Sequence, residues 1–431
     1  MAITKELEGV QALDSMIGKM EKTIQSLRTK GAPLSDIYFW EALLGAYQRA
    51  HQANLEGQPL AMTGFFVPQE LFHAMDIANL CAENHATFVG QSALDKIEQL
   101  FDLGEGYGLG NEVCSPHRIA VGLAVSRQMP RPSFIVSTAT SCDQTLKLYE
   151  VLADLYQVPI YVVDSPFIDN EPALQYARED IKQLIRFLEE QSGRTLDWGR
   201  LREVLDISKA TYDYWDKINH LRMAVPSPTG GRPSVKDFSI MLTCCGQEAG
   251  LKYFRSRFEE LKEKVDKGEG YIPNERHRVA WLYVLPMFDL KISDWLEEKY
   301  GAVIVMDSFG YASEEIELDP SDPIDYLVKK PLKWAFIRQT YAPNEYSHFA
   351  ERMAKLCHDY KADVAVVLAH WSCSQYCGTI RLLKEEITGA LGIPFFVLDG
   401  DIMDARVVSG AQMRAKLDEF FAMVEGRGTR V

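Results

Sequence analysis

The sequence has little positive charge and no long apolar run. Its 46 lysines and arginines are outnumbered by 61 aspartates and glutamates, which gives a formal net charge of −15. A strongly negative chain is poorly suited to general binding of nucleic acid or of an anionic membrane surface. No apolar run approaches the roughly 20 residues that a membrane-spanning helix needs. We therefore expect no nucleic-acid partner and no membrane partner.

The first residues lack the composition of a secretory signal. Lys5, Glu6 and Glu8 stand where a signal peptide has its apolar stretch. This composition predicts a cytoplasmic protein, and disulfides are uncommon in that compartment. The eight cysteines are therefore expected to pack in cores, to bind metal or to take part in catalysis.

Two common ligand-binding motifs are missing as well. No pair of cysteines has the CxxC spacing of a zinc ribbon. There is no GxxxxGK followed by Ser or Thr, so the chain is not expected to hydrolyse ATP itself. The glycine-rich stretch 104–110 does not follow a clear strand, and we predict a flexible loop near the site there rather than a dinucleotide-binding turn.

Short apolar runs alternate with helical patterns along most of the chain. This alternation predicts parallel βαβ units, and the continuous apolar character of the runs fits sheets that are covered on both faces. The predicted fold is α/β, with two Rossmann-like parallel-sheet domains facing each other and a helical N-terminal and middle portion. The predicted segments are a helical region at 1–58, a first α/β domain at 59–170, a helical middle region at 171–270 and a second α/β domain at 271–431.

Three cysteines stand where a predicted helix begins. Cys142 follows the apolar run 133–139, and Cys373 follows the run 362–371. Cys114 lies just before Pro116, a residue that suits the first turn of a helix. Ligands of open α/β sheets bind beyond the carboxyl ends of the strands, and a helix N-terminus lowers the pKa of a thiol. The three sulfurs could converge on one metal site; the alternative is that they only pack in the interior.

The other cysteines give weaker signals. Cys377 lies four residues after Cys373 and is a further candidate ligand, although we favour a packing role. Cys244 and Cys245 are adjacent and would point about 100° apart in a helix. Two more cysteines end helical patterns and are interpreted as packing residues, Cys81 and Cys357; Cys81 is also kept as a further candidate ligand. A four-cysteine zinc site is a competing chemistry, but structural zinc usually draws on closely paired ligands.

Three stretches of the sequence resemble the 2-hydroxyacyl-CoA dehydratase family, which includes the cluster-bearing subunits of benzoyl-CoA reductase. They are CSPHRIAVG (114–122), TATSCDQTLKLYEVL (138–152) and AHWSCSQYCGTIRLLKEE (369–386), within a similarity that spans about 63–425. The resemblance implies a 4Fe–4S cluster held by three cysteines, which here are Cys114, Cys142 and Cys373.

The resemblance also implies residues that act near the cluster. A carboxylate is expected there, and Glu70 in the turn that begins at Pro68 is the candidate; the alternative is a first-turn glutamate favoured by the helix dipole. His117 and His370 adjoin the segments of ligand cysteines and are candidates for a catalytic acid or base. Either histidine could instead be a structural group.

A mechanism and a set of partners follow from the resemblance. A separate ATP-dependent iron–sulfur activator protein would deliver one low-potential electron, and the acyl-CoA substrate would become a ketyl radical anion. Hydroxide would leave from C2 and a proton from C3, and the electron would then be returned. An open iron would act as a Lewis acid. A homologous partner subunit, or a second copy in a homodimer, would complete the enzyme.

Several alternatives remain open from the sequence. The family carries out both dehydration and ring reduction, and a related subunit can relay electrons without binding substrate. Another branch forms homodimers around a double-cubane 8Fe–9S cluster and reduces small molecules; the surplus cysteines Cys81, Cys357 and Cys377 are compatible with it. The most distant alternative is a non-redox binding module with zinc or without metal.

Overall fold

The computed structural model describes residues 9–139, 142–164, 170–310, 316–334 and 346–428. Lys5, Glu6 and Glu8, which the localisation prediction used, lie outside these ranges. No helix within the described ranges combines the length and the apolar character needed to cross a membrane. The contacts divide the chain into two units, each assembled from separate segments. Unit 1 is Met1–Trp215, Ser239–Phe258 and Glu314–Tyr341; unit 2 is Asp216–Phe238, Glu259–Ser313 and Ala342–Val431.

Unit 1 is built on a four-stranded parallel sheet. Its strands are β1 (Leu60–Thr63), β2 (Ala78–Cys81), β3 (Phe134–Thr138) and β4 (Ile160–Val163), in the order β2-β1-β3-β4. The two central strands, β1 and β3, are buried along their whole length. A parallel sheet that is covered on both faces needs apolar residues on both sides of its central strands. This explains why their sequences do not alternate between apolar and polar residues.

The helices of unit 1 surround this sheet. They are α1 (Val10–Thr29), α2 (Leu34–Glu56), α3 (Gln69–Ala74), α4 (Ala82–Ser92), α5 (Ile97–Gly106), α6 (Ser115–Val125), α7 (Asp143–Tyr156), α8 (Glu171–Ser192), α13 (Pro323–Lys329) and the 3-10 turn η3 (Lys330–Lys333). Three long helices contribute residues to both units: α9 (Trp198–Leu221), α10 (Gly231–Thr243) and α11 (Glu248–Lys267).

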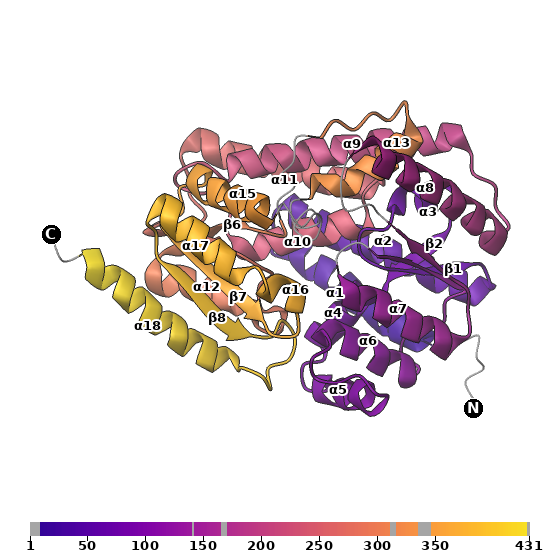
Figure 1. Cartoon of the computed structure of the whole chain (residues 1–431), viewed down its shortest axis with the longest axis horizontal. Coiled ribbons are helices and arrows are strands. Elements are labelled where there is room, and N and C mark those ends of the chain that lie inside the picture. Colours follow the sequence, from indigo (N-terminus) through magenta and orange to yellow (C-terminus); the bar gives the residue numbers. More distant parts are fainter. Residues whose placement is uncertain (1–8, 140–141, 165–169, 311–315, 335–345, 429–431) are drawn as a thin grey trace. The chain divides into compact units, whose positions relative to one another are not determined.

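Unit 2 contains the second four-stranded parallel sheet. Its strands are β5 (His277–Trp281), β6 (Ala302–Asp307), β7 (Val364–His370) and β8 (Phe395–Gly400), in the order β6-β5-β7-β8. Its shorter elements are η2 (Met287–Asp289), α12 (Lys291–Tyr300), α15 (Tyr346–Asp359) and α16 (Ser374–Cys377). Two further helices, α17 (Ile380–Leu391) and α18 (Gly410–Gly428), both contact β8 (Figure 1).

The two sheets have the same strand order. Counted along the chain, the second strand of each sheet lies at one edge, followed by the first, third and fourth. The order therefore reverses between the first and third strands, and in open α/β sheets ligands bind beyond the carboxyl ends of the strands at such a point. The prediction of two parallel-sheet α/β domains is confirmed. The division into four consecutive segments stays a prediction.

Two local predictions are wrong. The first concerns Cys81, which was expected to end a helical pattern. Instead α3 ends at Ala74, Asp76 takes a positive φ of 52°, and Cys81 is the last residue of strand β2. A left-handed residue cannot continue a right-handed helix, so the chain turns at Asp76 and enters the sheet.

The second error concerns the glycine-rich stretch 104–110. Its first three residues belong to helix α5, which ends at Gly106. A Cβ atom at Gly104 would lie 2.4 Å from the carbonyl oxygen of Arg118, and one at Gly122 would lie 2.1 Å from that of Leu100. These glycines therefore allow α5 and α6 to pack with their backbones in close approach.

Candidate functional site

Each of the three predicted ligand cysteines is the N-cap residue of a helix. Cys114 precedes α6, Cys142 precedes α7, and Cys373 precedes α16. All three are partly exposed. Backbone N–H groups at a helix N-terminus favour negative charge such as that of a thiolate. This electrostatic argument is weakest for Cys373, because α16 is only four residues long.

The structure brings the Cys114 and Cys142 segments together within unit 1. The backbone N–H of Cys114 donates to Oε1 of Gln144 at 2.5 Å, and Nε2 of Gln144 donates to the Glu112 carbonyl at 3.2 Å. Gln144 stands two residues after Cys142, at the start of α7. Cys373 belongs to unit 2. Across the described ranges, no group of three or more His, Cys, Asp and Glu side chains could hold a metal ion.

The backbone before Cys114 is held by Arg118, whose side chain is fully buried. Its Nε donates to the Val113 carbonyl at 3.0 Å, and its Nη1 donates to Oε1 of Glu105 at 2.7 Å. The guanidinium also lies over the ring of Phe101, 4.7 Å from its centre. Arg118 therefore ties the turn that carries Cys114 to helix α5.

A buried carboxyl group, that of Glu83, lies close to the segments that carry Cys114 and Cys142. Glu83 has no exposed surface, and Tyr149 donates a hydrogen bond to its Oε2. The Cys81 thiol donates to the same oxygen at 3.4 Å, and Nε2 of His117 lies 3.9 Å from Oε1. Burial disfavours the charged form of the group and raises the pKa of Glu83 to about 7. His117 is itself buried beside Glu83, so in its predicted role as an acid or base it would act on this group of buried side chains.

The same carboxyl group is linked to the Cys142 thiol through Thr145. The Sγ of Cys142 and the Oγ1 of Thr145 are 3.5 Å apart, and the Thr145 hydroxyl lies near Glu83, where it favours the ionised form of that carboxyl group. Tyr149 lies on the same helix, and its hydroxyl contacts the carbonyl of Thr63 at the end of β1. The end of the first strand and the start of α7 are therefore joined through one buried network.

The Cys373 segment has a buried network of its own. The backbone N–H of Cys373 donates to the carbonyl of His370, the last residue of β7, at 2.7 Å. The Ser372 hydroxyl lies 3.1 Å from Nε2 of His370 and donates to Oδ2 of Asp401 at 3.2 Å. That oxygen lies 3.3 Å from Nδ1 of His370. Asp401 thus holds Ser372, the residue before Cys373, and lies close to the ring of His370.

Exposure separates the eight cysteines into two groups. Four are partly exposed and four are buried; the buried group is Cys81, Cys244, Cys245 and Cys357. Burial raises the pKa of all four thiols, to about 11 for Cys244 and about 12 for Cys245 and Cys357. A thiolate is the form that binds iron or zinc, and burial disfavours that form of these four thiols. The three predicted ligands fall in the partly exposed group. Their thiol side chains are the kind of ligand that an iron–sulfur cluster needs.

The fourth partly exposed cysteine is Cys377. Its Sγ donates to the carbonyl of His370 at 3.3 Å, and burial is the main cause that raises the pKa of its thiol. Both observations favour the packing role that we preferred from the sequence. Whether it is a ligand stays a prediction.

Glu70, the carboxylate expected near the cluster, is held by a buried ion pair. It lies in the first turn of α3, and its Oε2 is 2.6 Å from Nζ of Lys330. Its Oε1 accepts a hydrogen bond from the Ser208 hydroxyl at 2.7 Å, and Tyr326 donates to Ser208 at 2.9 Å. Both oxygens of Glu70 therefore have partners within unit 1, and its predicted catalytic role remains a prediction.

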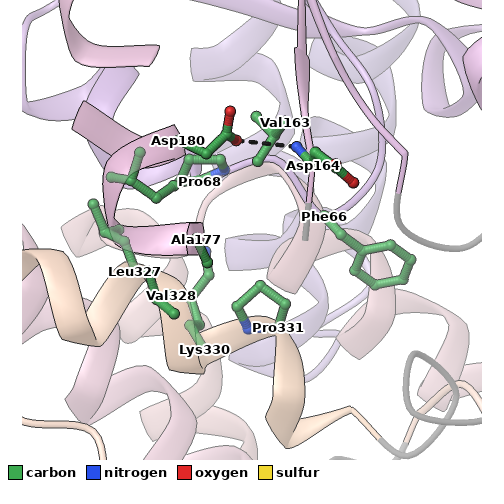
Figure 2. A pocket seen from close by; sticks show the side chains of 11 residues that line it. Phe66, Pro68, Val163, Asp164, Ala177, Asp180, Leu327, Val328, Lys330 and Pro331 are labelled. Carbon is green, nitrogen blue, oxygen red and sulfur yellow. Dashed lines mark hydrogen bonds between the residues drawn. The ribbon is translucent and has the colours of Figure 1, made fainter. Parts of the chain in front are cut away.

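A small cavity lies beside Lys330 (Figure 2). It is bordered by Phe66 and Pro68 beyond the end of β1, and by Asp164 just after β4. The backbone N–H of Asp164 donates to Asp180 at 3.0 Å across one side of it (Figure 2). Its volume of about 10 Å³ is close to what one water molecule needs. This cavity does not accommodate an acyl-CoA.

Sequence reasoning did not single out Glu83, Tyr149 or Arg118. Glu83 and Arg118 lie in segments whose other residues are largely buried, and Tyr149 lies on the buried side of α7. An ionisable or hydroxyl-bearing residue in such a segment is rarely buried without a partner, and this was the one available signal. The partners could not be predicted from neighbouring residues in the sequence, because Tyr149 lies 66 residues from Glu83 in the chain.

Comparison with known proteins agrees with the predicted resemblance. Residues 65–424 match the family described as 2-hydroxyglutaryl-CoA dehydratase, D-component. The chain is 23% identical to the (R)-phenyllactyl-CoA dehydratase alpha subunit of Clostridium sporogenes over 398 residues, which cover 88% of this chain and 93% of that one. It is 24% identical to one of the subunits of the Thauera aromatica benzoyl-CoA reductase over 417 residues, which cover 89% and 93%.

A third relative is the alpha subunit of the lactoyl-CoA dehydratase of Anaerotignum propionicum, 23% identical over 413 residues that cover 88% of this chain and 94% of the relative. All three similarities extend over most of both chains. The chain therefore belongs to the 2-hydroxyglutaryl-CoA dehydratase D-component family and is an enzyme subunit of the 2-hydroxyacyl-CoA dehydratase and benzoyl-CoA reductase type.

Proposed function

We propose that this subunit holds a 4Fe–4S cluster on Cys114, Cys142 and Cys373 and acts on an acyl-CoA thioester. The main support is the common placement of the three cysteines, each of which is a partly exposed N-cap residue. Cys142 and Cys373 also follow the third strand of two sheets with the same strand order. The substrate class is supported by the names of the relatives, which are subunits of acyl-CoA dehydratases and of benzoyl-CoA reductase.

The residues around the cysteines would hold the ligands in place. Gln144 and Arg118 fix the backbone on either side of the Val113–Cys114 bond, and Asp401 holds Ser372 beside Cys373. A cluster with one open iron supplies a Lewis acid for an oxygen of the substrate. His117, His370 and Glu70 are the proposed groups for moving protons near it.

The proposed reaction uses a single electron. An ATP-dependent iron–sulfur activator would supply it, and the thioester carbonyl of the substrate would accept it to form a ketyl radical anion. In a dehydration, hydroxide leaves C2, a proton leaves C3, and the electron returns, so no net reduction occurs. In a ring reduction the electrons would stay in the product. A related partner subunit or a second copy of this chain would complete the enzyme in the cytoplasm.

One observation keeps the double-cubane alternative as a second candidate. Cys377 is partly exposed and lies one helical turn from Cys373, so it could add a ligand to a larger 8Fe–9S cluster. The hydrogen bond from its thiol to the His370 carbonyl argues for the simpler cluster.

The proposal is tested by anaerobic electron transfer. The purified subunit is mixed with an activator protein of this enzyme class, with and without ATP, and the reduced cluster is followed by electron paramagnetic resonance. We expect an ATP-dependent signal that Cys142→Ser abolishes and that the buried control Cys244→Ser retains. A signal that is unchanged in Cys142→Ser would overturn the ligand assignment, and the absence of any iron signal would overturn the proposed function.

A further inference from the structure

In unit 1, helices α6 and α7 each follow a proposed ligand cysteine. Glu83 lies beside the residue at the same position in both helices. His117 is the third residue after Cys114 in α6, and Thr145 is the third residue after Cys142 in α7. The backbone N–H of His117 donates to the Cys114 carbonyl at 2.9 Å, and that of Thr145 donates to the Cys142 carbonyl at 3.1 Å. Both side chains border the carboxyl group of Glu83. The two cysteine-bearing helix starts therefore share one buried partner.

The second turn of α7 reaches the same carboxyl group through Tyr149. Its hydroxyl lies within hydrogen-bond distance of both the Glu83 carboxyl group and the Thr63 carbonyl at the end of β1, and it accepts the N–H of Ala82 at 3.2 Å. Glu83 itself stands in the first turn of α4, directly after β2. The network therefore joins two strand ends to the two helices that carry Cys114 and Cys142.

The hydrogen bonds to Glu83 meet one oxygen of its carboxyl group. Tyr149 and Cys81 both donate to Oε2, whereas Oε1 makes no hydrogen bond to the described residues and lies 3.9 Å from Nε2 of His117. Glutamine could keep an acceptor at the position of Oε2 and so retain both hydrogen bonds, whereas alanine removes the acceptor. In a site without solvent, the Tyr149 hydroxyl and the Cys81 thiol would then each lose this partner, and that loss is costly.

We propose that Glu83 is a positioning residue for the cluster: it holds helices α6 and α7 at the relative position that sets the spacing of the Cys114 and Cys142 thiols. The inference rests on the function proposed above. Glu83 has no exposed surface, so it acts through the helices that carry the ligands rather than by contact with substrate. Partners that fix the orientation of metal ligands typically change metal affinity by about 10- to 100-fold when they are removed.

The test compares Glu83→Ala and Tyr149→Phe with the control Tyr156→Phe. Tyr156 is also a buried tyrosine of α7, but its hydroxyl donates at the far end of the helix, to the Met129 carbonyl at 3.3 Å. Each full-length variant is reconstituted anaerobically with iron and sulfide, and iron per chain, the reduced-state paramagnetic resonance spectrum and the thermal unfolding midpoint of the apoprotein are measured.

We expect Glu83→Ala and Tyr149→Phe to lower the apparent affinity for iron about tenfold or more and to change the resonance spectrum of the cluster that remains. Tyr156→Phe should keep the wild-type iron content and spectrum even if its unfolding midpoint falls as much as that of Tyr149→Phe. Wild-type iron and an unchanged spectrum in folded Glu83→Ala would overturn the inference. An equal loss of iron in Tyr156→Phe would also overturn it, because general destabilisation would then suffice.

The two proposals fail in different ways. If the wild-type chain binds no iron, the proposed function fails before any Glu83 variant is compared. If the wild type binds about four irons on three cysteines and the Glu83 variants match it, only the positioning role of Glu83 is lost.

Discussion

Cys142 and Cys373 occupy equivalent positions in the two units. Each follows the third strand of a parallel sheet, β3 in one unit and β7 in the other, and each is the N-cap residue of the next helix. Each also has a neighbouring hydroxyl beside a buried carboxyl group: Thr145 lies near Glu83 in unit 1, and Ser372 donates to Asp401 in unit 2. The hydroxyl stands three residues after Cys142 and one residue before Cys373, so the two places share the kind of support but not its position.

The two cysteines of the α16 segment should behave differently on substitution. Cys373→Ser is expected to reduce iron per chain to a small fraction of the wild-type value, because it removes a proposed ligand. Cys377→Ser should leave iron unchanged, because its thiol donates to the His370 carbonyl and a serine hydroxyl can do the same. The measurement is iron and acid-labile sulfide after anaerobic reconstitution. Loss of iron in Cys377→Ser would instead support the larger double-cubane cluster.

The ion pair between Glu70 and Lys330 should be important for stability. Its nitrogen and oxygen are 2.6 Å apart, and both side chains are buried. Glu70→Gln leaves the lysine charge buried without its partner, which is expected to lower the free energy of unfolding by about 3–5 kcal/mol. The double variant Glu70→Gln/Lys330→Met should regain much of that loss. Urea denaturation of the apoprotein measures both.

Lys329→Met is the matched control, because the neighbouring lysine forms a more exposed ion pair with Asp325 at 2.6 Å. Its removal should change the free energy of unfolding by no more than about 1 kcal/mol. A loss in the double variant equal to that in Glu70→Gln would contradict this account of the ion pair. If folded Glu70→Gln also changed the spectrum of the bound cluster, that result would support the proposed position of Glu70 near the cluster.

The stability of the apoprotein should depend on pH through Glu83. Burial raises its pKa from 4.5 to about 7, so between these values the folded chain binds more protons than the unfolded chain. The free energy of unfolding therefore falls as the pH rises through this range, by on the order of 3 kcal/mol for this group. Glu83→Gln should lack this component. We predict that the free energy of unfolding of the wild type falls, relative to that of the variant, as the pH rises from about 5 to about 8. A constant difference would show that Glu83 keeps an ordinary pKa.

Two glycines of α5 provide a test of helix packing beside Cys114. A Cβ atom at Gly104 would lie 2.4 Å from the Arg118 carbonyl oxygen, whereas one at Gly106 would meet nothing within 4 Å. Gly104→Ala should therefore lower the free energy of unfolding by about 1–3 kcal/mol, since α5 and α6 must move apart. Gly106→Ala should leave it unchanged or raise it by up to about 1 kcal/mol through helix propensity. Equal effects in thermal denaturation would show that the close approach of the two helices is not required.

The parts of the fold that the sequence predicted correctly have strong local signals. Strands β3 and β7 are continuous apolar runs, and the helices after them begin at Cys142 and Cys373 as expected. Strand β2 was missed because it has four residues and directly follows the apolar pattern of α3. Its separation from the helix depends on the positive φ of Asp76, which a single sequence does not specify.

The support of the site was harder to predict than its ligands. Glu83 has the local appearance of an ordinary first-turn glutamate, and Tyr149 that of one more apolar residue in α7. Their hydrogen bond depends on the packing of α4 against β2 and of α7 against β3, and neither contact has a local sequence signature. The same applies to Lys330, whose partner Glu70 lies 260 residues away.

The most direct test is the iron and acid-labile sulfide content of the anaerobically purified chain, measured for the wild type and for Cys114→Ser, Cys142→Ser, Cys373→Ser and the buried control Cys245→Ser. We predict about four irons per wild-type chain, a clear loss in each of the first three variants, and no loss in Cys245→Ser. Full iron in any of the three would remove that cysteine from the ligand set, and loss of iron in Cys245→Ser would mean that the set is wrong. About eight irons per chain would favour the double-cubane cluster, and no iron after reconstitution would contradict the account as a whole.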